Sequence, residues 1–364
     1  MMRKLYILIL LLLNAGLLQA GVVEKTFYFN NYKVGSKGIY QTLNFDNTIQ
    51  SGIAGEPVLP WQEIVLMLPP GEVASTMEVI EEDLTAIPGS FLLFPKQQVR
   101  PISEDKATEF TRNEKVYRQN ESYPVQTTGH LMTQYLNGFP FALATYTPLR
   151  YHPLSKQISY FRKVTIRIHT NPAPASDQIL NPSYATAKIR SRVSSFAQNP
   201  EMLNNYPARK SPLTGYQYLI VSPVSFKNEF QPLISMYAAK GICAKVVALD
   251  TILSNVNGYD DPEKIRNFII DQFHTQGVEY VLLAGIPPLM PCRGFYAIVH
   301  YGPGNGGGVE EEDYNIPSDL YFSGLDGNYD ANGNHQYGEV ADNPDLLPDI
   351  SVGRFTAADT AELH

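Results

Sequence analysis

Length, composition and charge place the chain among ordinary globular proteins. It has 364 residues, of which 44% are hydrophobic and 18% charged, and this length allows two domains with separate cores. The formal net charge is −8, and no stripe of basic residues of the kind that binds nucleic acid is present, so no nucleic-acid partner is expected. Two cysteines, Cys243 and Cys292, are too few for a disulfide framework.

The N-terminus carries the features of a secretory signal peptide. Arg3 and Lys4 form a short basic region, residues 5–13 are all apolar, and Leu18-Gln19-Ala20 fits a small-residue cleavage site. Residues 1–20 are therefore predicted to be removed, so that the mature protein begins near Gly21 and is secreted or held at the cell surface. No later apolar run is long enough to span a bilayer, and no membrane span is predicted.

Residues 21–170 are predicted to form a β-rich domain. Residues 26–29 and 63–68 are rich in β-branched and aromatic residues, and residues 157–161 and 164–168 alternate between polar and apolar side chains. Frequent prolines favour many short strands over helices. A sandwich or barrel is the simplest packing for this pattern.

Residues 171–215 are predicted to be a linker between two domains. The segment is rich in proline and contains few apolar clusters, which is typical of a domain boundary. It also carries the basic residues Arg190, Arg192, Arg209 and Lys210, so proteolytic processing is expected between about residues 190 and 215.

Residues 216–364 are predicted to form an α/β domain with a parallel sheet. Apolar strands at residues 218–221, 244–249 and 280–284 alternate with segments of helical periodicity around residues 226–237 and 261–276. The loops that carry function in such sheets leave the carboxyl ends of the strands.

Local signals refine the helices and one cysteine of this domain. Asp261 is the expected N-cap of the second helix, with Pro262 in its first position and Gly277 after its end. Pro232 predicts a late start or a kink in the first helix. Cys243, beside the start of a strand, is expected to be a small buried hydrophobe.

An acidic loop in this domain predicts a calcium site. Residues 294–353 contain eleven acidic residues and no Lys or Arg, and Asp326, Asn328, Asp330 and Asn332 place oxygen atoms at every second position. This pattern resembles the start of a calcium loop, although the position of the glycine excludes an EF-hand. The alternatives are a calcium site completed by Glu339 or Asp342, and a solvated acidic turn.

Several stretches together resemble the gingipain-type cysteine peptidases. In the second domain the similar residues are Tyr218-Leu219-Ile220-Val221-Ser222, Lys240-Gly241, Ile265-Arg266-Asn267-Phe268-Ile269, Tyr280-Val281-Leu282-Leu283-Ala284-Gly285, Ser318-Asp319-Leu320-Tyr321 and Pro348-Asp349-Ile350-Ser351-Val352-Gly353-Arg354-Phe355. In the first domain they are Gly55-Glu56-Pro57-Val58-Leu59-Pro60 and Pro148-Leu149-Arg150-Tyr151-His152-Pro153, which are similar to the family's propeptide. Ile286 departs from the family, which often has an Asp there.

The resemblance implies a multidomain precursor of a secreted cysteine endopeptidase. Residues 21–170 would be a propeptide that packs on its own catalytic domain, and residues 216–364 the N-terminal part of a caspase-like α/β domain, truncated at the C-terminus. The family's catalytic His and Cys follow the Gly353-Arg354-Phe355 stretch, so they are expected beyond His364 and no catalytic residue is assigned. Gly129-His130 spells the family's Gly-His motif but lies in the propeptide-like region.

The family implies protein or peptide substrates. A second interpretation is a non-catalytic secreted binding or adhesion protein that keeps the fold. A Gly-His motif followed by a strand that ends in Cys, further along the reading frame, would favour the enzyme.

Overall fold

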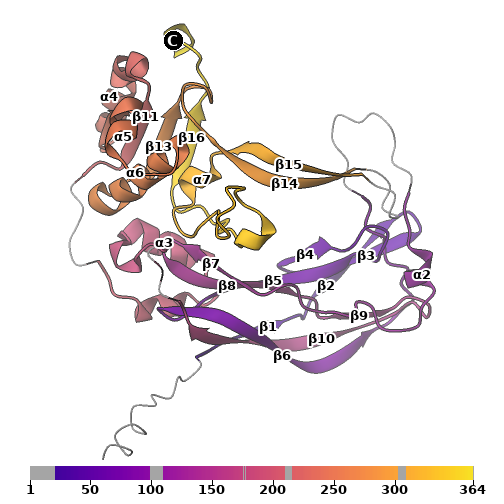
Figure 1. Ribbon diagram of the computed structural model, residues 1–364. Helices are drawn as coiled ribbons and strands as arrows, with labels where there is room; N and C mark the ends of the chain where they lie inside the picture. The colour runs from indigo at the N-terminus through magenta and orange to yellow at the C-terminus, as the bar shows by residue number, and fades with distance from the viewer. Residues whose placement is uncertain are drawn as a thin grey trace, which may run out of the picture.

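The computed structural model describes residues 21–98, 110–174, 176, 178–209, 215–301 and 309–363, with side chains omitted at 299–301 and 309–311. The predicted signal peptide and Lys210 lie outside these ranges. The described residues form a β-rich N-terminal domain and an α/β C-terminal domain, and a short helical segment packs between them (Figure 1). Within the described ranges, no helix is long and apolar enough to cross a membrane.

The N-terminal domain is built from antiparallel strands in two main sheets and a hairpin. The first sheet contains β1 (Val22–Tyr28), β6 (Glu72–Ile87), β9 (Leu149–His152) and β10 (Gln157–Pro172). The second has the order β4 (Thr48–Ser51), β5 (Leu59–Met67), β8 (Phe139–Tyr146) and β7 (Met132–Leu136). The hairpin pairs β2 (Tyr32–Lys37) with β3 (Tyr40–Phe45), and one short helix, α2 (Glu114–Tyr117), lies in a connection.

The two sheets enclose one hydrophobic core, as expected for a sandwich. Ile64 and Leu66 of β5 are fully buried against Ile166 and Ile168 of β10 and the residues around them. The two strands predicted at 157–161 and 164–168 are one strand, β10, because their apolar side chains stay in phase and face the same core.

The segment predicted as a linker contains helical structure. It holds η1 (Pro182–Tyr184), α3 (Ala187–Phe196) and η2 (Pro200–Asn205). The Thr186 side chain caps α3 by accepting a hydrogen bond from the Ile189 N–H, and Ile189 and Val193 are buried one helical turn apart. This helix is not evident from the sequence because its apolar face consists of few residues.

The C-terminal domain is centred on a four-stranded parallel sheet. The strand order is β12 (Ala244–Ala248), β11 (Tyr218–Ser222), β13 (Tyr280–Ala284) and β16 (Ser351–Phe355). The helices are η3 (Val224–Phe230), α4 (Gln231–Ala239), α5 (Leu249–Asn255), α6 (Asp261–Gln276), α7 (Leu320–Ser323), η4 (Val340–Asp342) and η5 (Thr360–Leu363). A separate antiparallel hairpin pairs β14 (Arg293–Tyr301) with β15 (Val309–Ser318).

Helices cover both faces of the parallel sheet. Leu219 and Val221 of β11 belong to the core that contains α5 and α6, whereas Ile220 between them packs with η3 and α4. The near-continuous apolar strands therefore have the sequence that a sheet buried on both sides requires, and the predicted parallel sheet is confirmed.

The helix boundaries agree with two of the three local signals. Pro232 lies in the first turn of α4, so the predicted late start is confirmed. Gly277 ends α6 in the left-handed conformation, with φ 85°. The N-cap of α6 is Asp260 instead of Asp261, because the Asp260 carboxylate accepts a hydrogen bond from the Glu263 N–H.

These contacts predict where the connection between the domains is cut. Arg190 donates hydrogen bonds to the carbonyl oxygens of Leu203 and Tyr206, and Arg192 to that of Asp349, so both are held on α3. Arg209 also donates a hydrogen bond, to the Tyr184 carbonyl, but it lies after η2 and outside any helix or strand. We therefore expect limited trypsin digestion to cut first at Arg209 or at Lys210, the next residue in the sequence.

Mass spectrometry of the first fragments checks this expectation. A variant carrying Arg209→Gln and Lys210→Gln should be cut more slowly, whereas Arg192→Gln should leave the first cut in place. First cuts within residues 21–174 would show that the boundary between the domains is misplaced.

Candidate functional site

The carboxyl edge of the parallel sheet is the first candidate region. The chain passes from β11 to β12 on one side and from β13 to β16 on the other, so the connections after the neighbouring strands β11 and β13 run in opposite directions. Ligands of open α/β sheets bind at such a point. The loops at this edge begin at Ser222 and Gly285. Gly285 has φ 127°, a conformation that other residues rarely adopt, and its N–H donates to the Phe355 carbonyl at 2.8 Å.

Arg354 of β16 holds this edge together. Its guanidinium forms a two-pronged ion pair with Asp319, at 2.7 and 2.8 Å. It also donates to the carbonyl oxygens of Gly285, Met290 and Pro291 in the loop after β13. The planar guanidinium suits several acceptors at once, so one side chain fixes the ends of two strands and the start of α7.

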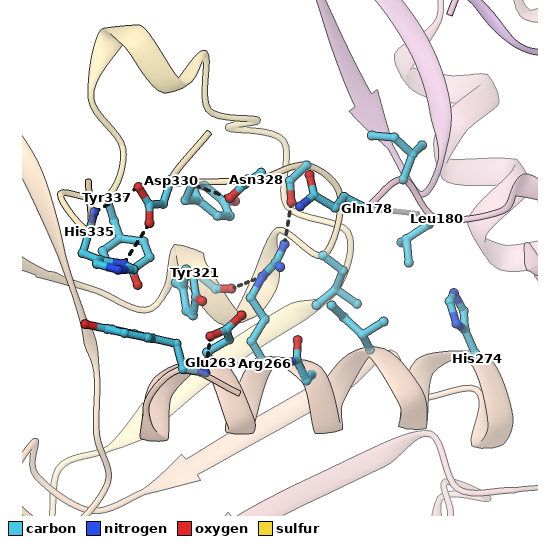
Figure 2. A pocket seen from close by; sticks show the side chains of 17 residues that line it. Gln178, Leu180, Glu263, Arg266, His274, Tyr321, Asn328, Asp330, His335 and Tyr337 are labelled. Carbon is cyan, nitrogen blue, oxygen red and sulfur yellow. Dashed lines mark hydrogen bonds and ion pairs between the residues drawn. The ribbon is translucent and has the colours of Figure 1, made fainter. Parts of the chain in front are cut away.

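Arg266 of α6 organises the acidic loop in the same way. Its side chain donates to the carbonyl oxygens of Tyr321, Gly324, Asp326 and Gly327, at 2.9 to 3.3 Å. Figure 2 shows Arg266 beside Tyr321. The loop has little regular secondary structure, so its carbonyl groups need partners from elsewhere.

A pocket of about 430 Å³ lies between α6 and this loop. Figure 2 shows Glu263, Arg266 and His274 on the α6 side, with Asp330 and His335 on the loop side. The His335 Nδ1 atom lies 3.1 Å from the Asp330 carboxylate, and its ring stacks on Tyr259 at the pocket wall. Gln178 and Leu180 close the far side, so the pocket is lined by residues of the predicted linker and of the C-terminal domain.

The residues predicted to bind calcium are not brought together around one point. The Asp326 carboxylate is fully buried and accepts hydrogen bonds from the N–H groups of Gly138 (2.8 Å) and Leu180 (2.6 Å). Asn328, Asp330 and Asn332 instead accept hydrogen bonds from N–H groups of their own loop. Asp326 is thus directed at the N-terminal domain and the other three at their own loop.

Two further buried carboxylates, Asp345 and Asp349, lie beside Asp326. Asp345 accepts a hydrogen bond from the Tyr135 N–H at 2.8 Å, and Asp349 one from the Asn137 N–H at 2.5 Å. The donors Tyr135, Asn137 and Gly138 lie in or beside the tight turn that joins β7 to β8. The roles of Asp345 and Asp349 are not evident from the sequence, because their partners lie about 210 residues away.

Burial makes the charged state of these carboxylates costly. It raises the pKa of Asp345 to about 7, against the lowering effect of hydrogen bonds from the Leu347 and Tyr135 N–H groups. Burial also raises the pKa of Asp326 well above its usual value, and the neighbouring Asp349 charge adds to this effect. The pKa of Asp349 is raised as well, again by burial.

The acidic loop offers a poor fit to a metal ion. Among the described residues, no group of three or more His, Cys, Asp or Glu side chains is arranged to hold a metal. Both oxygen atoms of Asp326 already accept main-chain hydrogen bonds. The calcium site stays a prediction, and no chemical step is derived from it.

The two cysteines lie apart from a nucleophile–base arrangement. Cys243 is exposed at the amino end of β12, so the expectation that it is buried is wrong. Its position in the turn before an edge strand explains the exposure. Cys292 is half-buried and precedes β14, the strand that contains His300. The extended backbone of β14 places His300 roughly 25 Å from Cys292, so the two do not form a nucleophile–base pair.

Two family models match consecutive parts of the chain. Propeptide_C25 matches residues 20–189, and the model of peptidase family C25 matches residues 211–364. None of the curated proteins matches the chain.

Three solved structures from Porphyromonas gingivalis are similar. The complex of RgpB pro- and mature domains is 17% identical with a TM-score of 0.39, over 50% of this chain and 92% of that one. Gingipain K, described for its zymogenic latency, is 19% identical with a TM-score of 0.35, over 44% of this chain and 96% of that one. Dimeric latent PorU is 11% identical with a TM-score of 0.24, over 94% of this chain and 34% of that one. The fold described above rests on this chain's own topology.

Calcium is expected to stabilise the C-terminal domain if the loop around Asp330 binds it. An ion bound only by the folded state at about 100 times its Kd adds about 2.7 kcal/mol to the free energy of unfolding. The measurement is the calcium-induced rise in melting temperature of the wild type and of Asp330→Ala. Asp313→Ala is the control, since Asp313 is an exposed aspartate that, like Asp330, accepts a hydrogen bond from a main-chain N–H a few residues further on. Equal rises in all three proteins would place any site elsewhere.

The buried carboxylates predict an unusual pH dependence. Because the pKa of Asp345 is higher in the folded than in the unfolded chain, its contribution to stability is present below pH 4 and is lost as the pH rises through about 7. The wild type should therefore gain melting temperature between pH 8 and pH 5 relative to Asp345→Asn, which lacks this titration. Parallel melting profiles over that range would contradict the assignment.

Proposed function

Because the chain belongs to peptidase family C25, with a propeptide ahead of its peptidase domain, we propose that it is the precursor of a secreted cysteine endopeptidase. The observation that carries the proposal is the order of the two family matches, of which the first covers the β-rich domain and the second the α/β domain. Protein or peptide substrates follow from the family. The predicted signal at residues 1–20 supports secretion.

The nucleophile and base of this enzyme are proposed to lie outside the 364 residues. Covalent catalysis needs a thiol and a base within hydrogen-bond reach. Cys243 lies at the amino end of its strand, whereas functional loops of such sheets leave the carboxyl ends. Of the histidines in the described part of the C-terminal domain, His274 stacks on Tyr184 and His335 pairs with Asp330.

Peptide hydrolysis tests the proposal. Residues 21–364, cut after Arg209, are expected to show no thiol-dependent hydrolysis of a mixed peptide library. The complete gene product is expected to hydrolyse the library, to be inhibited by iodoacetamide and to remain active in the Cys243→Ser, Cys292→Ser double variant.

Two outcomes would contradict the proposal. Hydrolysis by residues 21–364 that Cys292→Ser alone abolishes would make Cys292 the nucleophile. A complete gene product that is secreted and folded but hydrolyses no peptide would favour the binding or adhesion protein.

A further inference from the structure

Gly21, the first residue of the predicted mature protein, packs closely against the end of the first sheet. Its carbonyl oxygen accepts a hydrogen bond from the Thr170 N–H at 2.9 Å, at the point where β1 begins to pair with β10. A Cβ added at Gly21 would lie 2.5 Å from Oε2 of Glu72 and 2.6 Å from Oγ1 of Thr170. Both distances are shorter than real Cβ contacts, so a larger residue at position 21 would displace Glu72 or Thr170.

Glu72, at the start of β6, places a carboxylate beside Gly21. The side chain is half-buried and accepts a hydrogen bond from the hydroxyl group of Thr170, which is fully buried. Within the described ranges, no Lys, Arg or His side chain forms an ion pair with this carboxylate. A carboxylate that has lost part of its hydration is stabilised by a nearby positive charge, and the folded chain supplies none here.

The main-chain nitrogen of Gly21 lies close enough to supply that charge. Nitrogen and Cβ of one residue are about 2.5 Å apart by standard covalent geometry, so this nitrogen lies within about 5 Å of Glu72 Oε2. In a chain that begins at Gly21, the nitrogen is an ammonium group at neutral pH. Rotation about the Cα–C bond can turn it toward Glu72 while the carbonyl oxygen stays bonded to Thr170, and glycine permits this rotation most freely.

We infer that Glu72 and Thr170 form a binding site for the amino terminus that is created when residues 1–20 are removed. Hydrolysis of the bond between Ala20 and Gly21 consumes one water molecule, leaves a carboxylate on Ala20 and frees the amine of Gly21, which takes up a proton. The resulting ammonium forms an ion pair with Glu72. This inference rests on the proposed secretion, because removal of the signal peptide creates the new terminus.

Removal of the signal peptide then stabilises the N-terminal domain. Figure 1 shows β1, β10 and β6 side by side, and the ion pair joins the first residue before β1 to the first residue of β6. The rule for the cleavage site restricts the residues before the cut, such as Ala20. Glycine after the cut follows instead from the packing around position 21.

A comparison of two chain lengths in two backgrounds tests the ion pair. Residues 21–364 are compared with residues 18–364, in which the ammonium is displaced by up to about 10 Å along the chain. Both lengths are made with Glu72 and with Glu72→Gln, which keeps an acceptor for the Thr170 hydroxyl but removes the charge. Glu78→Gln is the control, because Glu78 lies on the same strand but pairs with Arg167 and His169.

The measurement is the melting temperature of the N-terminal domain, followed by the fluorescence of Trp61, the single tryptophan of the chain. At pH 7 the shorter chain should melt at least about 2 °C higher than the longer one. The difference should vanish in Glu72→Gln and persist in Glu78→Gln.

The difference should also vanish at pH 10. Pairing with Glu72 raises the pKa of the amine above its ordinary value of about 8, so the stabilisation is complete below that pH and is lost as the pH rises further. The charged and titratable groups on the adjoining segments are present in both chains, so their own titration cancels: Glu24, Lys25, Glu78, Arg167, His169 and Tyr206.

Acetylation of the Gly21 amine gives a second measurement that needs no substitution. The acetyl group removes the terminal charge, and reaction near pH 6.5 favours this amine over lysine because its ordinary pKa is lower. Acetylation should lower the melting temperature of residues 21–364 to that of residues 18–364. It should leave the melting temperature of Glu72→Gln unchanged.

Two outcomes would overturn the inference: equal melting temperatures for the two chain lengths with Glu72, or the same difference between them with Glu72→Gln. The start of each chain is set by design, and neither export nor peptidase activity is needed. Loss of the ion pair and loss of the proposed function are therefore separate results.

Discussion

Burial of three carboxylates between the domains is the constraint on which the rest of the structure depends. A carboxylate removed from water is costly unless hydrogen-bond donors replace the lost hydration. Here the donors are main-chain N–H groups at Tyr135, Asn137, Gly138 and Leu180, together with N–H groups of the acidic loop itself. The β7–β8 turn thus supplies a donor to each of the three carboxylates.

Arginine side chains donate hydrogen bonds to carbonyl groups of the acidic segment. The acidic segment after α7 has little helix or strand, so its carbonyl groups have no ladder to join. Arg266 satisfies three of them, those of Gly324, Asp326 and Gly327, from α6. Arg192 satisfies those of Pro348 and Asp349 from α3. Aspartate side chains of this segment accept from N–H groups, and arginine side chains donate to its carbonyl groups, so each of these bonds has a main-chain group on one side.

Periodicity in the sequence predicts the elements but not the pairing across domains. The parallel sheet and α6 follow from apolar runs and capping residues, which are local signals. Asp326 shows the limit: its spacing from Asn328, Asp330 and Asn332 is typical of a calcium loop, yet its partners are Gly138 and Leu180. Asp326 accepts a hydrogen bond from an N–H 188 residues earlier in the chain. No feature of the neighbouring sequence distinguishes it from an aspartate that accepts from an N–H two residues further on.

The burial of Cys243 and the presence of α3 also depend on contacts that the neighbouring sequence does not reveal. An apolar neighbourhood in the sequence indicated that Cys243 is buried, but β12 is an edge strand and strand order is not a local property. Likewise α3 needs only Ile189 and Val193 on its apolar face, because the core it joins is supplied by both domains.

The mixed character of the interdomain contact makes separation feasible. The shared core includes Phe139 and Phe141 of the propeptide beside residues of the peptidase domain, and exposing them costs free energy in proportion to the apolar area. Exposing the three carboxylates does not add such a cost, since water can replace the N–H donors that they lose on separation. An interface whose centre is polar on both sides gives up less on separation than an apolar core of the same area, which is the property that a propeptide needs if it is to leave.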